Sequence, residues 1–448
     1  MAQECSKNGG DLQKTCNMKK ALFIAYYFPP CGGGGVQRTL KFVKYISSFG
    51  WTPVVITVKE NVHILEDESH SKDVPSQVKV YRTWTFEPGS KAKRFRVKFR
   101  NATAINPITI IKSLIAKTLN LLSAIFLVPD AQILWAPFAI LKGISVIKNE
   151  KIDILYTTGN PFSTYLTGVF LKLILSKPLI VDFRDPWVTG EYRVWESKFR
   201  KKIEGILEKF VIKYADKVIS TTELMTMDFT NTYPNEPADK FITITNGFDS
   251  DDFKGISTRR IDKKFTITYA GIIYEYLPME NFLRALKELV VENTEMAGNT
   301  RVIFVGETKE LREYPIEQFG LASIIEFTGY QPHTKSVEYL LNSDVLLLFR
   351  DARTKNLYPG KMFEYFFAKK PILGLMEKGL ASDLINKLNA GIIISPKDIL
   401  AIKSGVYNLY QQYKEGKLSD INNPTTQNFN RKNLTEKLAG LFDKVSAS

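Results

Sequence analysis

The sequence predicts an α/β protein built from two doubly wound parallel sheets. Short β-branched or aromatic runs alternate with segments of helical length, which is typical of parallel strands covered by helices on both faces. With 448 residues the chain exceeds one ordinary core, so two domains of roughly 200 residues each are expected. The expected strands are 21–28, 52–58, 152–158, 178–183, 216–221 and 241–246, then 265–271, 301–306, 324–329, 344–349, 371–375 and 390–395.

A charged connection separates the two groups of expected strands. The first group ends at "ITNGFD", the segment "KGISTRRIDKK" follows at 254–264, and "FTITYAG" begins a second series. We therefore expect an N-terminal domain at 18–255, a C-terminal domain at 256–427 and a helical tail at 428–448 that crosses back. Open parallel sheets bind ligands beyond the carboxyl ends of their strands, so two facing sheets predict a site in the central cleft.

Charge and cysteine content narrow the functional classes. The formal net charge is +14, and residues 1–150 hold most of the excess, with 21 Lys and Arg against 10 Asp and Glu. Cys5, Cys16 and Cys31 provide neither a disulfide framework nor a metal-ligand spacing. Residues 1–17 lack the apolar core of a secretory signal and are interpreted as a leader, with Met18 a candidate start. We expect a reducing, cytoplasmic location.

A basic segment followed by an apolar one lies at 91–128. The run "KAKRFRVKFR" carries six cations and no acid, and the apolar residues 108–128 include Lys112 and Lys117. Those charges argue against a spanning helix, whereas cations beside an apolar helix suit an anionic membrane surface. A solvated loop followed by a core helix is the alternative. No nucleic-acid module is recognised, so nucleic acid is not expected as a partner.

Four glycines, Gly32 to Gly35, join the first expected strand to a helix that begins at Val36. A helix N-terminus offers free N–H groups, and glycine lets an anion approach them closely. The spacing matches neither a dinucleotide fingerprint nor a P-loop. We interpret the run as a phosphate or ligand site, with a flexible tight turn as the alternative.

Two further segments carry candidate chemistry. In "PGKMFEYFF", Lys361 and Glu364 share one side of a short helix, where they suit a phosphate and vicinal hydroxyls or form an ordinary ion pair. In "VDFRDPW", Asp182, Arg184 and Asp185 end a buried strand. Asp185 is the first candidate for acceptor binding or base catalysis and Asp182 the second. An Asp–Arg pair that anchors the loop is the alternative.

Metal ligation and histidine catalysis are not expected. The three histidines, His63, His70 and His333, lie outside the segments that carry candidate chemistry.

Six segments occur in the order typical of one enzyme family. They are "YYFPPCGGGGVQRTLKFVKYI", "VDFRDPW", "ITNGFD", "TYAG", "FTGY" and "PGKMFEYFFAKKPILGL". Over roughly residues 18–445 the chain resembles GT-B glycosyltransferases, and among them the family 4-like group. The resemblance implies two Rossmann-like domains facing a cleft, and transfer of a sugar from a nucleotide-sugar donor with retention and without a metal or cofactor. The donor is then expected on the C-terminal domain and the acceptor on the N-terminal domain.

The resemblance also implies roles for single residues. Glu364 matches the second glutamate of the family's E-x7-E motif, which holds the donor ribose, whereas Asn356 stands in place of the first. The family's Arg and Lys after the first C-domain strand are missing, and Gly271 stands there. Lys361 is then the best cation for the diphosphate, aided by Arg350 or Arg353.

Gly33 and Gly34 match the N-domain loop that approaches the donor phosphates. We expect that closure of the two domains leaves no room there for side chains.

The expected function is that of a hexosyl- or N-acetylhexosaminyltransferase in bacterial surface-glycan biosynthesis. Its acceptor is expected to be a lipid-linked or polysaccharide intermediate, and its location the cytoplasm, peripheral on the inner face of the membrane. A GT-B sugar-nucleotide epimerase is one alternative, although such enzymes need several cleft carboxylates and histidines. A catalytically inactive GT-B binding or scaffold protein is the other.

Overall fold

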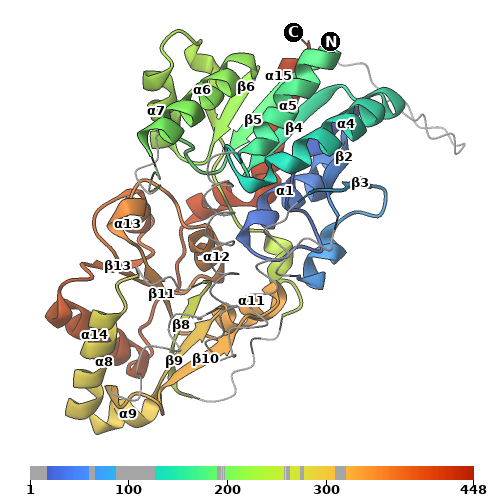
Figure 1. The fold of residues 1–448 in the computed structure, drawn as a ribbon. Helices are drawn as coiled ribbons and strands as arrows, with labels where there is room; N and C mark the ends of the chain where they lie inside the picture. The colour runs from blue at the N-terminus through green and yellow to red at the C-terminus, as the bar shows by residue number, and fades with distance from the viewer. Residues whose placement is uncertain are drawn as a thin grey trace, which may run out of the picture.

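The computed structural model describes residues 18–59, 66–86, 127–188, 193, 195, 197–256, 258, 263–272, 277–307 and 319–447. They form two parallel β-sheets with helices packed on both faces, and the two domains lie one above the other in Figure 1. The predicted α/β class with two doubly wound domains is confirmed. The basic and apolar segment predicted at 91–128 lies outside the described residues except for its last two.

The first sheet has the strand order β3-β2-β1-β4-β5-β6-β7, and all its described pairings are parallel. Its strands are β1 (Lys19–Ile24), β2 (Trp51–Val58), β3 (Lys79–Thr83), β4 (Ile154–Gly159), β5 (Leu179–Phe183), β6 (Lys217–Ser220) and β7 (Phe241–Thr243). Strand β3 was not predicted. It pairs with β2 alone, and because an edge strand needs no continuous apolar run, its mixed sequence "KVYRT" lacks the buried-strand pattern.

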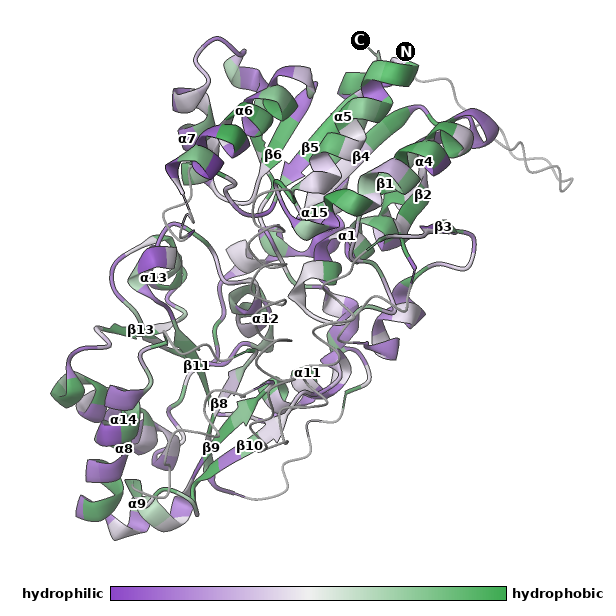
Figure 2. Ribbon diagram, viewed as in Figure 1, coloured by the Kyte–Doolittle hydropathy of each residue, from purple (hydrophilic) through white to green (hydrophobic). Residues whose placement is uncertain are grey.

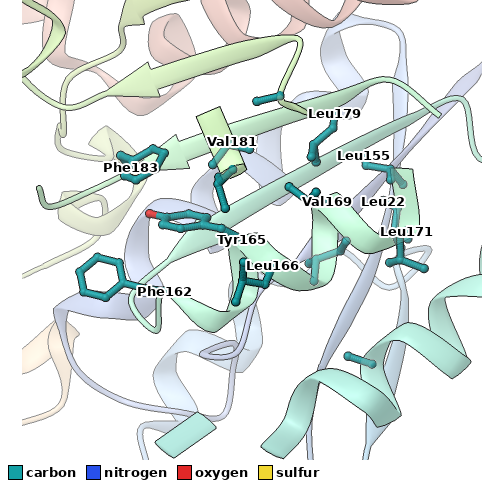
Figure 3. Close-up of a cluster of buried hydrophobic side chains, with 14 of the residues drawn as sticks. Leu22, Leu155, Phe162, Tyr165, Leu166, Val169, Leu171, Leu179, Val181 and Phe183 are labelled. Atoms are coloured by element: carbon teal, nitrogen blue, oxygen red, sulfur yellow. The ribbon is translucent and has the colours of Figure 1, made fainter. Parts of the chain in front are cut away.

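Helices cover the first sheet on two faces. One face holds α4 (Ala136–Glu150), α5 (Ser163–Leu175), α6 (Lys198–Tyr214) and α7 (Glu223–Thr232), and the other holds α1 (Gly34–Tyr45) and α15 (Arg431–Ala447). In the hydrophobic core on the face covered by α4 to α7, Tyr165 and Val169 of α5 lie beside β5 (Figure 3). In the core on the other face, the ring of Phe442 lies 6.1 Å from that of Tyr156. The C-terminal helix therefore packs on the N-terminal domain.

The second sheet has the order β10-β9-β8-β11-β12-β13, again parallel. Its strands are β8 (Phe265–Ala270), β9 (Thr300–Val305), β10 (Ile325–Gly329), β11 (Val345–Phe349), β12 (Ile372–Leu375) and β13 (Gly391–Ile394). Its helices are α8 (Glu280–Glu292), α9 (Thr294–Asn299), α11 (His333–Leu341), α12 (Gly360–Ala368), α13 (Leu380–Lys387) and α14 (Ile399–Lys414). Figure 2 shows the central strands of both sheets to be mainly hydrophobic. Helices α8 and α14 pack in one hydrophobic core on one face of this sheet, and α11, α12 and α13 pack in a second core on the other face.

Short 3-10 helices complete the described structure. They are η1 (Ile46–Phe49), η3 (Glu68–Asp73), η4 (Ala131–Trp135), η5 (Ala238–Lys240), η6 (Ser250–Phe253), η8 (Ala352–Thr354) and η9 (Pro424–Phe429). Together, η4 and α4 make Ala131–Glu150, the one stretch of the described residues that is long and apolar enough to cross a membrane by length and composition. Trp135, Ala139 and Val146 of this stretch are buried in the core of the first domain.

Candidate active site

A cavity of about 480 Å³ lies between the two domains, where α1, α11 and α12 approach the middle of Figure 1. The glycine loop, α1 and η3 form its first wall, and the carboxyl ends of β8, β9 and β11 with the start of α12 form the second. The residues that line it include Gly33, Gly34, Gln37, Lys41, Asp67, His70, Asp249, Asp252, Gly271, Tyr330, His333, Arg350, Lys361, Glu364 and Arg431.

The glycine loop lies in this wall, but not for the expected reason. A Cβ atom added to Gly33 or Gly34 would meet no atom within 4 Å, so lack of room does not explain these two glycines in this structure. Gly33 has φ +93°, a backbone conformation that other residues rarely adopt. The expected lack of room applies instead to Gly32, where a Cβ would lie 2.6 Å from the Tyr330 hydroxyl of the other domain.

Lys361 takes up the space beside Gly271. A Cβ on Gly271 would collide with Nζ of Lys361, and Gly271 itself has φ +124°. The ammonium group also lies over the ring of Tyr269, 3.7 Å from its centroid. Burial, and then the charge of Arg350, lower the pKa of Lys361 to about 7. The Lys361 side chain thus brings a cation to the carboxyl end of β8, beside Gly271.

Glu364, one turn further along α12, is engaged by a histidine. Nε2 of His333 lies 3.0 Å from Oε1 of Glu364, and Nδ1 lies 3.8 Å from Oδ2 of Asp252. Burial alone opposes both charges. The hydrogen bond and the mutual attraction outweigh it, so the pKa of Glu364 is lowered and that of His333 is raised. The pair therefore favours its charged form.

Asp67 connects the two domains at the other side of the cavity. Its carboxylate accepts hydrogen bonds from the backbone N–H of His333 at 3.0 Å and from the Tyr330 hydroxyl at 3.3 Å. Nearby, the ring of His70 lies 5.7 Å from that of His333. Burial lowers the pKa of His70 to about 4, so this imidazole is neutral at physiological pH. Two of the three histidines therefore line the cavity, which the motif pattern did not indicate.

Lys41 is surrounded by carboxylates. Its Nζ lies 2.5 Å from Asp73 and 2.8 Å from Asp249, and it also pairs with Asp252. These three carboxylates can each direct an oxygen toward a common point, with all three oxygens within 4.8 Å of one another. Among the described residues this is the one group with a metal-like arrangement. The ammonium group of Lys41 already supplies the positive charge that the group needs.

The candidate acceptor residues are placed differently from one another. Asp182 is fully buried outside the cavity wall, where it accepts hydrogen bonds from Arg38 at 2.7 and 2.9 Å and from Tyr156 and Thr158. Arg184 donates to backbone carbonyls of Gly35, Gly159 and Asn160, so it anchors the loops as the alternative interpretation proposed, though without pairing with Asp182.

Asp185 also lies outside the cavity wall. It is half-buried and accepts a hydrogen bond from the Asn160 amide at 3.0 Å. Burial raises its pKa, against the charges of Arg184 and of Arg350 from the other domain. Asp185 thus remains the acceptor-side candidate that the structure brings near the second domain.

Two candidate donor residues lie outside the cavity wall. Asn356 is exposed, and Arg353 is exposed and paired with Asp351 at 2.7 Å. Arg350 does line the cavity, and its Nη2 donates to the carbonyls of Thr354 and Leu357 at 2.6 and 3.0 Å.

Comparison with known proteins gives a match over the second domain. Residues 264–412 match the family model described as Glycosyl transferases group 1. No curated protein sequence matches the chain. The family 4-like subgroup is not resolved by this match.

Among solved structures, sucrose-phosphate synthase from Thermosynechococcus elongatus is 12% identical, with a TM-score of 0.61 over 96% of this chain and 99% of that one. TarM of S. aureus is 12% identical, with a TM-score of 0.60 over 95% and 99%. A UDP-N-acetylglucosamine 2-epimerase described as putative, from Listeria monocytogenes, is 12% identical, with a TM-score of 0.57 over 96% and 97%. At this identity the likeness establishes the fold alone. The shared two-domain fold and the match over the second domain together support a glycosyltransferase of GT-B architecture.

Proposed function

We propose that the protein is a metal- and cofactor-independent, retaining glycosyltransferase that uses a nucleotide-diphosphate sugar as its donor. The observation that carries the proposal is the second wall of the cavity, where Lys361, Gly271 and the N-terminus of α12 converge at the carboxyl ends of β8 and β11. Backbone N–H groups and a half-buried cation suit a diphosphate. A structure of S. aureus TarM, which shares the fold, is described as a complex with UDP and α-GlcNAc-glycerol.

In this proposal, each of four residues has a role in sugar transfer. Breaking the bond from the sugar to the diphosphate places negative charge on the leaving group and positive charge on the anomeric carbon. Lys361 and Arg350 neutralise the leaving diphosphate, and Glu364 accepts hydrogen bonds from the donor ribose. Asp185 faces the acceptor from the first domain. The transferred group is a hexosyl or N-acetylhexosaminyl unit.

We further propose that the acceptor is a lipid-linked or polysaccharide intermediate of bacterial surface-glycan biosynthesis. The enzyme then works from the cytoplasm, docked on the inner face of the membrane through residues 91–128. Support comes from the neighbouring surface: Trp84 and Phe86, just before this segment, are half exposed. The exposed residues of α6 are all Lys, Phe or Ile, because its two acids, Glu204 and Glu208, are buried. Cosedimentation with anionic liposomes at low salt tests the docking, and its absence contradicts it.

A thermal-shift titration with UDP-, GDP-, ADP- and dTDP-sugars tests the donor class. We expect one of them to raise the melting temperature, and Glu364→Ala to weaken that effect by removing the ribose contact. No shift with any of the four contradicts the proposal. Binding without hydrolysis or transfer favours a catalytically inactive binding protein instead.

Sugar-nucleotide epimerisation is the second candidate, and one observation favours it. The cavity wall holds two histidines and several carboxylates, including His70, His333, Asp67 and Asp252. An epimerase interconverts a nucleotide sugar without any acceptor. Proton NMR of UDP-N-acetylglucosamine incubated with the protein alone separates the two functions. A second UDP-sugar signal supports epimerisation, and an unchanged spectrum contradicts epimerisation of this nucleotide sugar.

A further inference from the structure

The guanidinium of Arg431 is buried in the cavity wall without a counter-ion among the described residues. Arg431 is the first residue of α15, lines the cavity and is only 5% exposed. Its Nη1 is enclosed and has no hydrogen-bond partner. Within the described part of the chain, its side chain forms no ion pair either. A buried guanidinium without acceptors is costly, so its retention at a cavity indicates that a ligand supplies them.

Arg38 shows how the same fold satisfies a buried guanidinium when its role is structural. Arg38 is 1% exposed. It donates twice to Asp182, at 2.7 and 2.9 Å, and to the carbonyls of Ile244 and Thr245 at 2.8 and 2.7 Å. Arg431 is buried almost as completely and has none of these acceptors. The difference separates an internal ion pair from a cation held ready for a ligand.

The backbone of Arg431 is held firmly at the junction of the two domains. Its N–H donates to the carbonyl of Phe248 at 2.8 Å, and the N–H of Phe248 donates to the carbonyl of Phe429 at 3.0 Å. A Cβ on Gly247 would collide with that same carbonyl of Phe429, so the two segments pack without space between them. The backbone that carries the Arg431 side chain is therefore fixed in position, which suits a preorganised binding group.

The charged groups around Arg431 do not neutralise its guanidinium, so an added anion would be attracted to it. Burial, and then the positive charge of Arg38, lower the pKa of Arg431 to about 9. Glu364, Asp182 and Asp249 act in the opposite direction. Among the described residues, none of these carboxylates forms an ion pair with Arg431. The side chain is still charged at neutral pH, and an oxyanion at its free N–H groups would stabilise that charge.

We propose that Arg431 binds an oxyanion, a phosphate or a carboxylate, in the cleft between the two domains. Lys361 and Glu364 from α12 and Arg431 from the start of α15 line the same cavity. A ligand that spans this cavity therefore meets two cations and one carboxylate. The oxyanion belongs either to the donor diphosphate or to an anionic group on the acceptor, an assignment that rests on the proposed glycosyltransferase function.

The test compares Arg431→Gln and Arg431→Lys with the wild-type full-length protein. Dissociation constants are measured for UDP, GDP, ADP and dTDP, and for inorganic phosphate added to protein saturated with the nucleotide that binds best. We expect Arg431→Gln to weaken the binding of either the nucleotide or inorganic phosphate by at least tenfold. Arg431→Lys should weaken that binding less, because lysine keeps the positive charge. Loss of nucleotide affinity assigns the oxyanion to the donor. Loss of phosphate binding alone assigns it to the acceptor.

The stability of the ligand-free variants provides the second readout. Because Arg431 has no counter-ion to leave behind, Arg431→Gln should keep or raise the melting temperature, whereas Arg38→Gln should lower it strongly. Arg284→Gln, on the exposed side of α8, is the matched control and should change neither binding nor stability. Unchanged binding in Arg431→Gln, or a melting temperature as low as that of Arg38→Gln, overturns the proposal.

If the wild-type protein binds no nucleotide, the proposed function fails separately. The inference about Arg431 is then decided by inorganic phosphate alone, added to the nucleotide-free protein.

Discussion

The carboxyl ends of the two parallel sheets differ in how their polar side chains are used. In the first sheet, Asp182 and Arg184 follow or end β5, and both are fully engaged inside the domain. In the second, Gly271 and Arg350 follow β8 and β11 and line the cavity. Arg350 donates to carbonyls of its own domain, whereas Lys361, beside Gly271, has no acid paired with it among the described residues. Both edges carry charges at the position where α/β sheets bind ligands. What distinguishes a candidate site from a scaffold is whether those charges already have partners.

The largest effect is expected where the charges are paired. Asp182→Ala leaves the buried Arg38 guanidinium without its carboxylate, and breaking one partner of a buried ion pair costs about 3–5 kcal/mol. Chemical denaturation of the variant measures the loss in the free energy of unfolding. Exposed Asp239→Ala, whose partner Lys217 is also at the surface, is the control and should cost under ~1 kcal/mol. A stable Asp182→Ala protein that lacks activity would restore Asp182 as a catalytic candidate.

Lys361→Met, unlike Asp182→Ala, is expected to weaken ligand binding without lowering stability. The substitution removes a half-buried cation that has no acid paired with it among the described residues, so stability should be kept or increased. A charged hydrogen bond contributes about 1.5–3 kcal/mol, so the affinity for a nucleoside diphosphate should fall about 10- to 150-fold. Isothermal titration calorimetry measures this, with exposed Lys378→Met as the control. Equal affinity in both variants would remove Lys361 from the donor site.

The pH dependence of binding sharpens the role of Lys361. Its pKa is lowered to about 7, and a diphosphate prefers the protonated side chain. Nucleotide affinity should therefore fall as pH rises above about 7, by up to about tenfold per pH unit, and this slope should be absent in Lys361→Met. Calorimetry between pH 7 and 9 measures both slopes. Parallel curves for the two proteins would contradict the assignment.

The lowered pKa of Lys361 also makes the free energy of unfolding depend on pH. The folded pKa lies below the ordinary lysine value of 10.5, so between these pH values the unfolded chain binds more protons than the folded one. The destabilisation by Lys361 is thus greatest below pH 7 and fades as pH rises toward 10.5. The stability advantage of Lys361→Met should shrink in the same direction.

The smallest expected effect separates two neighbouring glycines. Gly33→Ala places a side chain at φ +93° and should cost about 1–2 kcal/mol of stability. Gly34→Ala meets no atom within 4 Å and begins α1, so its cost should be near zero. Denaturant unfolding of the pair measures the difference. Equal stabilities would show that the loop adopts another backbone conformation in solution.

Local patterns in the sequence predicted much of the fold. Twelve of the thirteen strands in the described part of the chain were expected, because continuous apolar runs between helical segments are a property of the local chain. Strand β3 was missed because its pairing at the sheet edge imposes no pattern on "KVYRT". The glycine loop, Lys361 and Glu364 were found because each belongs to a short motif, and all of them line the cavity.

Residues outside motifs could not be found in the same way. Asp67, His333 and Arg431 are more than 90 positions apart from one another, and their place in one cavity depends on how two domains and a returning helix pack. Asp182 and Lys361 looked alike as isolated charges near strand ends. Their difference depends on partners such as Arg38, 144 residues from Asp182 in the chain.

The sequence alone determined the two-sheet α/β class, the glycine loop after the first strand and the Lys361–Glu364 pair on one helix. These follow from hydrophobic periodicity and backbone preference, which act over a few residues. Only the tertiary structure decided which charges are satisfied and which are open to a ligand. That decision depends on burial and on the distance to counter-charges, and for Arg431 both are set by the return of the last helix to the first domain.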